Sequence, residues 1–231
     1  MPTRKSIAAH EAGHAILAWF CKSLTIVELS VGGTQNHVIY STPCPVTAEL
    51  AWENLVTGLA GIAGQFRAQF SAHGLECERD LKEARLLAES IVVQLALKGV
   101  PVNVAFPIDV SHRATISRMF HDEPSPPVRH VLEAAYFKAR LVLRVYDIEF
   151  RALRRALNFW DRFTPKEVEL LIGKSPAGKL VARGLFRRAA ARFVSGLRFL
   201  RWLRARHQIR VEQNVAPVLT KNVSHDSSSS K

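Results

Sequence analysis

A His-Glu-x-x-His pattern close to the start of the chain, at His10, Glu11 and His14, constrains the fold more than any other sequence feature. Two histidines four residues apart share one face only when the segment is an α-helix, where they stand about one turn apart. Residues 3–22 have the composition of such a helix, with Thr3 or Ser6 available as the N-cap. The pattern therefore predicts a helix that directs two imidazoles toward one point.

This histidine pair favours a metal site. Both imidazoles can reach one Zn²⁺ ion at about 2.1 Å, and Glu11 stands beside them, where it can take a proton from a metal-activated water molecule. The bare pattern also fits two histidines that satisfy their hydrogen bonds in a helix beside a buried glutamate. The motif alone leaves both interpretations open.

The remainder of the body is predicted to be mainly α, with one β-hairpin after the first helix. Residues 24–31 and 37–42 read as two strands joined at Gly32 and Gly33. Thr164 and Glu167 form a capping-box pattern with proline between them, so a short final helix is expected to start there and to end at Gly173. Further helices are predicted over residues 46–72, 78–97, 113–120 and 128–160.

Composition excludes several classes of protein. With 231 residues, 48% of them hydrophobic and 23% charged, the chain is neither disordered nor collagen-like, and three scattered cysteines do not make a disulfide scaffold. The apolar run after Arg4 and Lys5 is interrupted by the motif, so a secretion signal is not expected. We expect a cytoplasmic protein without a spanning helix.

The net charge of +12 is concentrated near the C-terminus. Residues 174–210 contain eleven Lys or Arg and no acidic residue, which leaves +1 on residues 1–173. We therefore expect three parts: a nearly neutral body (1–173), a basic amphipathic helix (174–211) and a disordered polar tail (212–231). Arginines alternate with apolar residues over 179–206, a pattern that favours an anionic membrane surface over a partner protein, and either of these over nucleic acid.

The residues around the motif add a resemblance. The run from Arg4 to Ala15 (RKSIAAHEAGHA) resembles the start of the peptidase domain of FtsH-type zinc proteases, which are membrane AAA+ proteases. Asp80-Leu81-Lys82-Glu83-Ala84 resembles the segment that carries the family's third metal ligand. The resemblance extends over residues 4–173. It implies a helical zinc-peptidase domain in which His10, His14 and Asp80 bind Zn²⁺, Glu11 is the catalytic base or acid, and a homo-oligomer can form.

Three departures from the family's pattern matter. The sequence shows no ATPase domain before the motif, so we expect flexible or unfolded polypeptide substrates and, for folded ones, a separate ATPase. Gln65 stands where the family has a glutamate that could orient a ligand histidine, and its loss of charge could weaken metal binding. Before Asp80, the residues His73, Glu76 and Glu78 could compete as the third ligand, whereas Cys77 is expected to be incidental.

These observations predict a zinc-dependent metalloendopeptidase, cytoplasmic or peripheral at the inner face of the membrane. The strand at residues 37–42 follows the motif helix and is the expected edge for an extended peptide substrate, although a hairpin that only covers the core fits equally well. The alternative to an enzyme is an inactive pseudo-protease that serves as a membrane- or partner-docking module.

Overall fold

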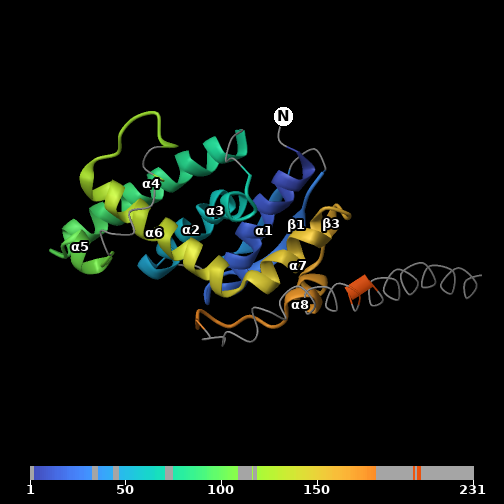
Figure 1. Cartoon of the computed structure of the whole chain (residues 1–231). Helices are drawn as coiled ribbons and strands as arrows, with labels where there is room; N and C mark the ends of the chain where they lie inside the picture. Colours follow the sequence, from blue (N-terminus) through green and yellow to red (C-terminus); the bar gives the residue numbers. More distant parts are fainter. Residues whose placement is uncertain are drawn as a thin grey trace, which may run out of the picture.

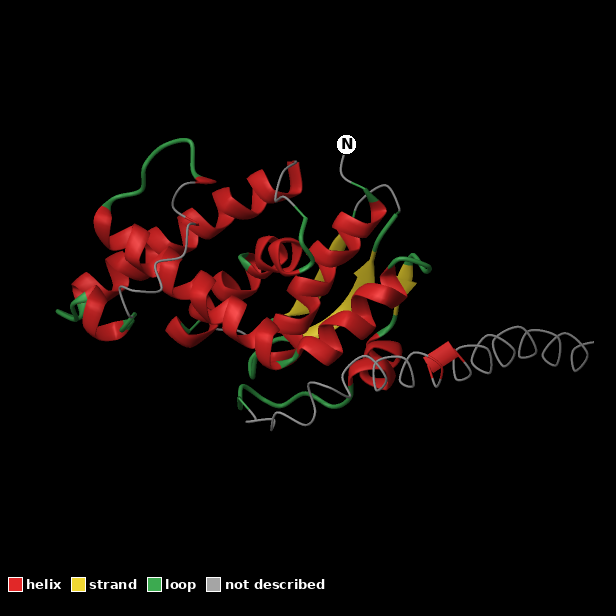
Figure 2. Cartoon of the chain, in the orientation of Figure 1, coloured by secondary structure: helices red, strands yellow, loops and turns green. Residues whose placement is uncertain are grey.

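A computed structural model describes residues 3–32, 36–43, 47–70, 75–108, 116, 119–180, 200 and 202–203. Within these residues the chain is mainly helical and carries one small three-stranded sheet (Figures 1 and 2). The predicted mainly-α fold with a hairpin after the first helix is therefore confirmed. Most of the predicted basic helix (174–211) and all of the polar tail (212–231) lie outside the described residues.

Helix α1 (Arg4–Phe20) carries the histidine motif and runs through the middle of the molecule, with β1 on one side and α3 on the other (Figure 1). Thr3 caps it by accepting a hydrogen bond from the backbone N–H of Ser6. The helix is buried along most of its length. Small residues lie along the middle of the helix and let neighbouring helices approach closely: Ala8, Ala9, Ala12, Gly13 and Ala15.

The sheet follows α1 directly. Strands β1 (Thr25–Ser30) and β2 (His37–Ser41) form the predicted antiparallel hairpin. A bulge between Ile26 and Glu28 interrupts the pairing register. Strand β3 (Arg162–Phe163), which the sequence did not predict, pairs with the other side of β1. The strand order β2-β1-β3 leaves β2 at one edge of the sheet.

The prediction of one continuous helix over residues 46–72 is wrong. The structure has two helices there, α2 (Ala48–Gly58) and α3 (Ala60–Arg67), separated at Leu59. Helix α3 crosses α1 at very short range: a Cβ on Gly64 would stand 2.4 Å from the carbonyl oxygen of Ala9. Glycine permits this contact because it has no Cβ.

The helix predicted over 128–160 is likewise two helices, α6 (Pro126–Val145) and α7 (Asp147–Leu157). They meet at Tyr146, which has φ −100° and ψ 36°, and whose hydroxyl donates a hydrogen bond of 2.6 Å to the carbonyl oxygen of Lys179. A long-range contact thus accompanies the break.

Three further helices complete the described fold. Helix α4 (Leu75–Leu97) begins three residues before the predicted start, and α5 (Val102–Ala105) was not predicted. Helix α8 (Pro165–Ile172) has the predicted capping box, with both reciprocal hydrogen bonds between Thr164 and Glu167. The helix predicted around 113–120 falls largely outside the described residues.

Residues 173–180 run back along the body. The indole N–H of Trp19 donates to the carbonyl oxygen of Gly173 at 2.7 Å, and the N–H of Gly178 donates to that of Phe20 at 2.6 Å. Trp202 is only 1% exposed and stacks on Phe163 of β3, with ring centroids 5.3 Å apart. In the part of the chain that the structure describes, no helix has the length and apolar character needed to cross a membrane.

Candidate metal centre

The two motif histidines meet on one face of α1. Their rings are arranged edge to face with centroids 4.7 Å apart, and their Nε2 atoms lie 3.0 Å from each other. His10 is buried and the side chain of His14 is 13% exposed. The helix spacing therefore does bring both imidazoles to one point, as the sequence predicts.

Asp80 of α4 reaches the same point from a distance of 66 residues along the chain. Its Oδ2 atom lies 2.9 Å from Nε2 of His10 and 3.0 Å from Nε2 of His14, and the carboxylate is buried. Among the described residues, these three form the one group of His, Cys, Asp or Glu side chains arranged to hold a metal ion. In the sequence, only the family resemblance of residues 80–84 pointed to Asp80 as the third residue of this cluster.

In the metal-free protein, His14 and Asp80 each shift the pKa of the other in the direction that favours its charged form. Burial disfavours the imidazolium form of His14, but the charge of Asp80 and its hydrogen bond outweigh burial and raise the pKa of His14 to about 9. Burial likewise opposes ionisation of Asp80, yet the charge of His14 and the hydrogen bonds from both histidines hold the pKa of this carboxyl well below its usual range. Two imidazoles therefore stabilise one carboxylate.

The residues fit a zinc ion. Two imidazole nitrogens and one carboxylate oxygen form a common three-residue donor set for zinc, and donors of a tetrahedral site stand roughly 3.4 Å apart. The observed separations of 2.9–3.0 Å are close to this spacing. Gly61 of α3 supplies the space: a Cβ at this residue would stand 2.4 Å from Nε2 of His14 and 2.7 Å from Nε2 of His10. A side chain there would fill the place next to both nitrogens.

A backbone carbonyl group of α2 orients the ring of His14. Its Nδ1 atom lies 2.8 Å from the carbonyl oxygen of Thr57. Because a carbonyl oxygen can only accept, Nδ1 carries a proton, and in the neutral ring Nε2 is left free to bind a metal.

His10 has a different partner. Its Nδ1 atom lies 4.0 Å from Sγ of Cys77, and this thiol donates a hydrogen bond of 3.0 Å to Oε1 of Gln65. Gln65 in turn donates from Nε2 to Oγ of Ser6 at 3.1 Å. Gln65 thus reaches His10 through the sulfur of Cys77. Cys77 was expected from the sequence to be incidental, although its position three residues before Asp80 places both on one face of α4.

Glu11 is 2% exposed and follows His10 on α1. Its negative charge also raises the pKa of His14, so the carboxylate lies near the cluster. Of the competing ligands, Glu78 is exposed and outside the cluster, whereas His73 and the side chain of Glu76 lie outside the described residues.

The edge strand β2 lies close to the same cluster. Burial raises the pKa of Tyr40 on β2, and the negative charges of Glu83 and Asp80 on α4 raise it further. The charge of Asp80 therefore acts on Tyr40, a residue of an outer strand of the sheet.

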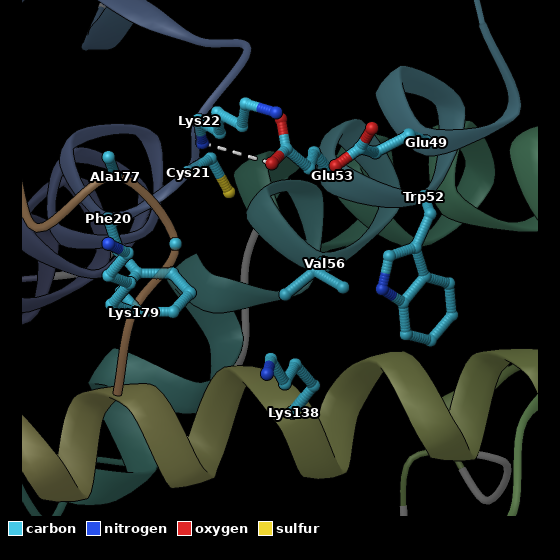
Figure 3. Close-up of a pocket in the computed structure, with 11 residues that line it drawn as sticks. Phe20, Cys21, Lys22, Glu49, Trp52, Glu53, Val56, Lys138, Ala177 and Lys179 are labelled. Carbon is cyan, nitrogen blue, oxygen red and sulfur yellow. Dashed lines mark hydrogen bonds between the residues drawn. The ribbon is translucent and has the colours of Figure 1, made fainter. Parts of the chain in front are cut away.

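A separate cavity of about 280 Å³ opens at the other end of α1 (Figure 3). None of the three cluster residues lines it. Glu53 on its wall already accepts hydrogen bonds from the backbone N–H groups of Lys22 and Ser23. Its apolar and cationic lining includes Phe20, Trp52 and Val56 together with Lys22, Lys138 and Lys179.

Comparison with known proteins gives one distant relationship. No protein-family model matches the chain. The mitochondrial inner membrane m-AAA protease component yta12 of Schizosaccharomyces pombe is 21% identical over 184 residues, which cover 75% of this chain and 24% of that protein. The chain thus spans about a quarter of the length of this relative. It is distantly similar to a component of a protease.

Proposed function

We propose that the chain is a zinc-dependent metalloendopeptidase that resembles the peptidase domain of FtsH-type proteases and hydrolyses flexible or unfolded polypeptides. The observation that carries this proposal is the convergence of His10, His14 and Asp80, whose donor atoms lie 2.9–3.0 Å apart beside Glu11. The distant similarity to a protease component supports it independently.

In this proposal His10, His14 and Asp80 hold the zinc ion. The bound ion would lower the pKa of a coordinated water molecule and polarise the scissile carbonyl group. Glu11 accepts the proton of the attacking water and gives it to the amine nitrogen of the departing product. Thr57 keeps the ring of His14 in place through its carbonyl oxygen.

The substrate class follows from the sheet. Strand β2 is an outer strand, so the backbone groups on its free side can pair with an extended peptide. A folded protein rarely presents such a backbone, whereas a flexible segment does. The nearness of Tyr40 to Asp80 supports a peptide path along β2 toward the metal. Self-association and cooperation with a separate ATPase belong to the same proposal.

Peptide cleavage by the zinc-loaded protein tests this function. Unfolded casein is the substrate, Glu11→Gln removes the proposed proton acceptor, and Glu169→Gln is the matched control because that glutamate is exposed on α8. We expect cleavage by the parent and by Glu169→Gln, and a loss of at least about 100-fold in Glu11→Gln. Equal activity in Glu11→Gln would contradict the proposal, and zinc binding without any cleavage would favour the pseudo-protease.

We also propose that the basic segment 179–206 docks the protein on an anionic membrane surface. One structural observation favours this: Lys22, Lys138 and Lys179 come from three separate parts of the chain to line the cavity of Figure 3, which Glu49 and Glu53 also line. No ion pair to any of them is present in the described part of the chain. The three lysines outnumber the two glutamates of the lining, which leaves it a formal charge of +1 that suits phosphate headgroups.

A further inference from the structure

The two motif histidines are oriented by groups of different chemistry. His14 faces a backbone carbonyl oxygen, whereas His10 faces the sulfur of Cys77. An imidazole that binds a metal through one nitrogen usually donates the N–H of the other to a fixed acceptor, which selects the tautomer and the ring orientation. Cys77 stands where that acceptor belongs.

The hydrogen bonds around Cys77 have one consistent direction. The thiol donates to Oε1 of Gln65, so the sulfur turns its lone pairs toward Nδ1 of His10. Gln65 can accept from the thiol only through its carbonyl oxygen, and its amide nitrogen then donates to Ser6. All three side chains are buried, with exposures of 7% for Ser6, 1% for Gln65 and 3% for Cys77.

This direction suits the state in which His10 binds a metal. In the metal-free protein Nε2 lies 2.9 Å from the carboxylate of Asp80 and donates a hydrogen bond to it. If a metal takes the place shared with His14 and Asp80, Nε2 binds it through a lone pair, and the proton of the neutral ring is on Nδ1, where it is donated to the sulfur. The sulfur therefore supplies the acceptor that the metal-binding tautomer needs.

Resting on the proposed function, we propose that Cys77 is a positioning residue for His10. Its thiol is held by Gln65, and through Gln65 by Ser6. The sulfur accepts a hydrogen bond from the Nδ1–H group and so keeps Nε2 directed at the metal site. Gln65 suits this role because one amide group offers both the acceptor that Cys77 needs and the donor that meets Ser6. The departure at Gln65 from the family's glutamate thus belongs to one hydrogen-bonded unit with Cys77.

Cys77 is not itself a ligand in this proposal. Its sulfur lies on the Nδ1 side of the His10 ring, whereas the metal cluster uses the Nε2 side. The thiol is therefore separated from the cluster by the imidazole that it orients.

The zinc dissociation constant of the full chain, measured by competition with a chromophoric chelator, is the first test. Cys77→Ala removes the acceptor, and Cys77→Ser restores a group that both accepts and donates. Cys21→Ala is the matched control, because Cys21 is the second buried free thiol among the described residues and contacts Thr57 rather than His10. We expect Cys77→Ala to weaken zinc binding by about 10- to 100-fold. The serine variant and the control should bind nearly as tightly as the parent.

The second test follows the Nδ1–H group of His10 by ¹⁵N–¹H NMR in the zinc-loaded protein, where Nε2 would bind the metal. We expect this proton to exchange slowly with water in the parent and in Cys77→Ser, where an acceptor holds it, and faster in Cys77→Ala. A folded Cys77→Ala that retains both the parent's zinc affinity and the slow exchange of this proton would overturn the proposal. A parent that binds zinc but cleaves no peptide would overturn the proposed function instead and leave this result intact.

Discussion

The carbonyl oxygen of Thr57 on α2 lies 2.8 Å from Nδ1 of His14 on α1, so the backbone of one helix fixes a ring of the candidate metal centre on another. The contact joins the C-terminal half of α2 to the motif. It also explains why α2 ends shortly after this residue, at Gly58, and α3 begins again at Ala60. The orientation of the candidate centre therefore depends on how α1, α2 and α3 pack together.

Replacing Gly61 with alanine should abolish zinc binding. The new Cβ would stand 2.4 Å from Nε2 of His14 and 2.7 Å from Nε2 of His10, in the place that a metal needs. Gly58→Ala is the matched control, because a Cβ there meets nothing within 4 Å. Metal analysis of the purified variants should find zinc in Gly58→Ala and none in Gly61→Ala. A zinc-replete Gly61→Ala would show that the metal lies elsewhere.

Replacing Gly13 with alanine should destabilise the fold itself. The added Cβ would lie 2.1 Å from the carbonyl oxygen of Ala60, and a backbone atom cannot move aside without shifting a helix. We expect a loss of about 3 kcal/mol in the free energy of unfolding, measured by urea denaturation of the metal-free protein. Gly58→Ala again serves as control and should be neutral or slightly stabilising. Equal stability of the Gly13→Ala and Gly58→Ala proteins would refute the close crossing of α1 and α3.

Parts of this architecture follow from local sequence patterns. The spacing of His10 and His14 predicted the face that they share, and the residues around Thr164 predicted the start of α8. The breaks at Leu59 and Tyr146 did not follow, because each lies beside a long-range contact: the carbonyl oxygen of Thr57 contacts His14, and the hydroxyl of Tyr146 contacts Lys179. Strand β3 is only two residues long, too short to leave a periodic pattern.

The candidate centre, too, could be predicted only in part from the sequence. The motif pointed to His10, Glu11 and His14, and a family resemblance was needed to choose Asp80, because α4 reaches the cluster only through tertiary packing. Neither source identified Gly61 or Cys77. A glycine that makes room and a thiol that accepts one hydrogen bond have no characteristic spacing, so only the three-dimensional arrangement reveals them.

Zinc affinity should rise with pH between about 6.5 and 9. The pKa of His14 is raised from 6.5 to about 9 in the metal-free protein, so this ring carries a proton at neutral pH that zinc must displace. Isothermal titration calorimetry in buffers of different ionisation enthalpy should find about one proton released per ion at pH 7.5. Zinc binding that is independent of pH over this range, with no proton release, would contradict the assignment of His14 as a ligand.

The same shifts predict how the stability of the metal-free protein varies with pH. The raised pKa of His14 contributes stability that is complete below 6.5 and is lost as pH rises toward 9. The lowered pKa of Asp80 contributes stability above about 4 that is lost as pH falls. Thermal unfolding should therefore show a maximum of this contribution between about pH 4 and 6.5. Asp80→Asn should flatten the difference between pH 6 and pH 9, and an unchanged profile in this variant would refute the coupling.

Membrane docking should depend on charge. Flotation with vesicles containing phosphatidylserine should recover the full chain, whereas neutral vesicles should not, and added salt should weaken the binding. Replacing both Lys22 and Lys138 with glutamine should reduce the partition coefficient by roughly tenfold or more, while Lys166→Gln on α8 serves as an exposed control. Equal recovery with neutral vesicles, or no effect of the double substitution, would remove the lysine-lined cavity from the docking surface.

The most direct test of the account is the zinc content of Asp80→Ala beside that of Glu78→Ala. Both residues belong to the first turns of α4, but only Asp80 lies within 3.0 Å of the two imidazoles. Purified parent protein and Glu78→Ala should each hold one zinc ion per chain, and Asp80→Ala should hold none after dialysis against a weak chelator. A parent without zinc, or an Asp80→Ala variant that keeps its ion, would contradict the proposed centre.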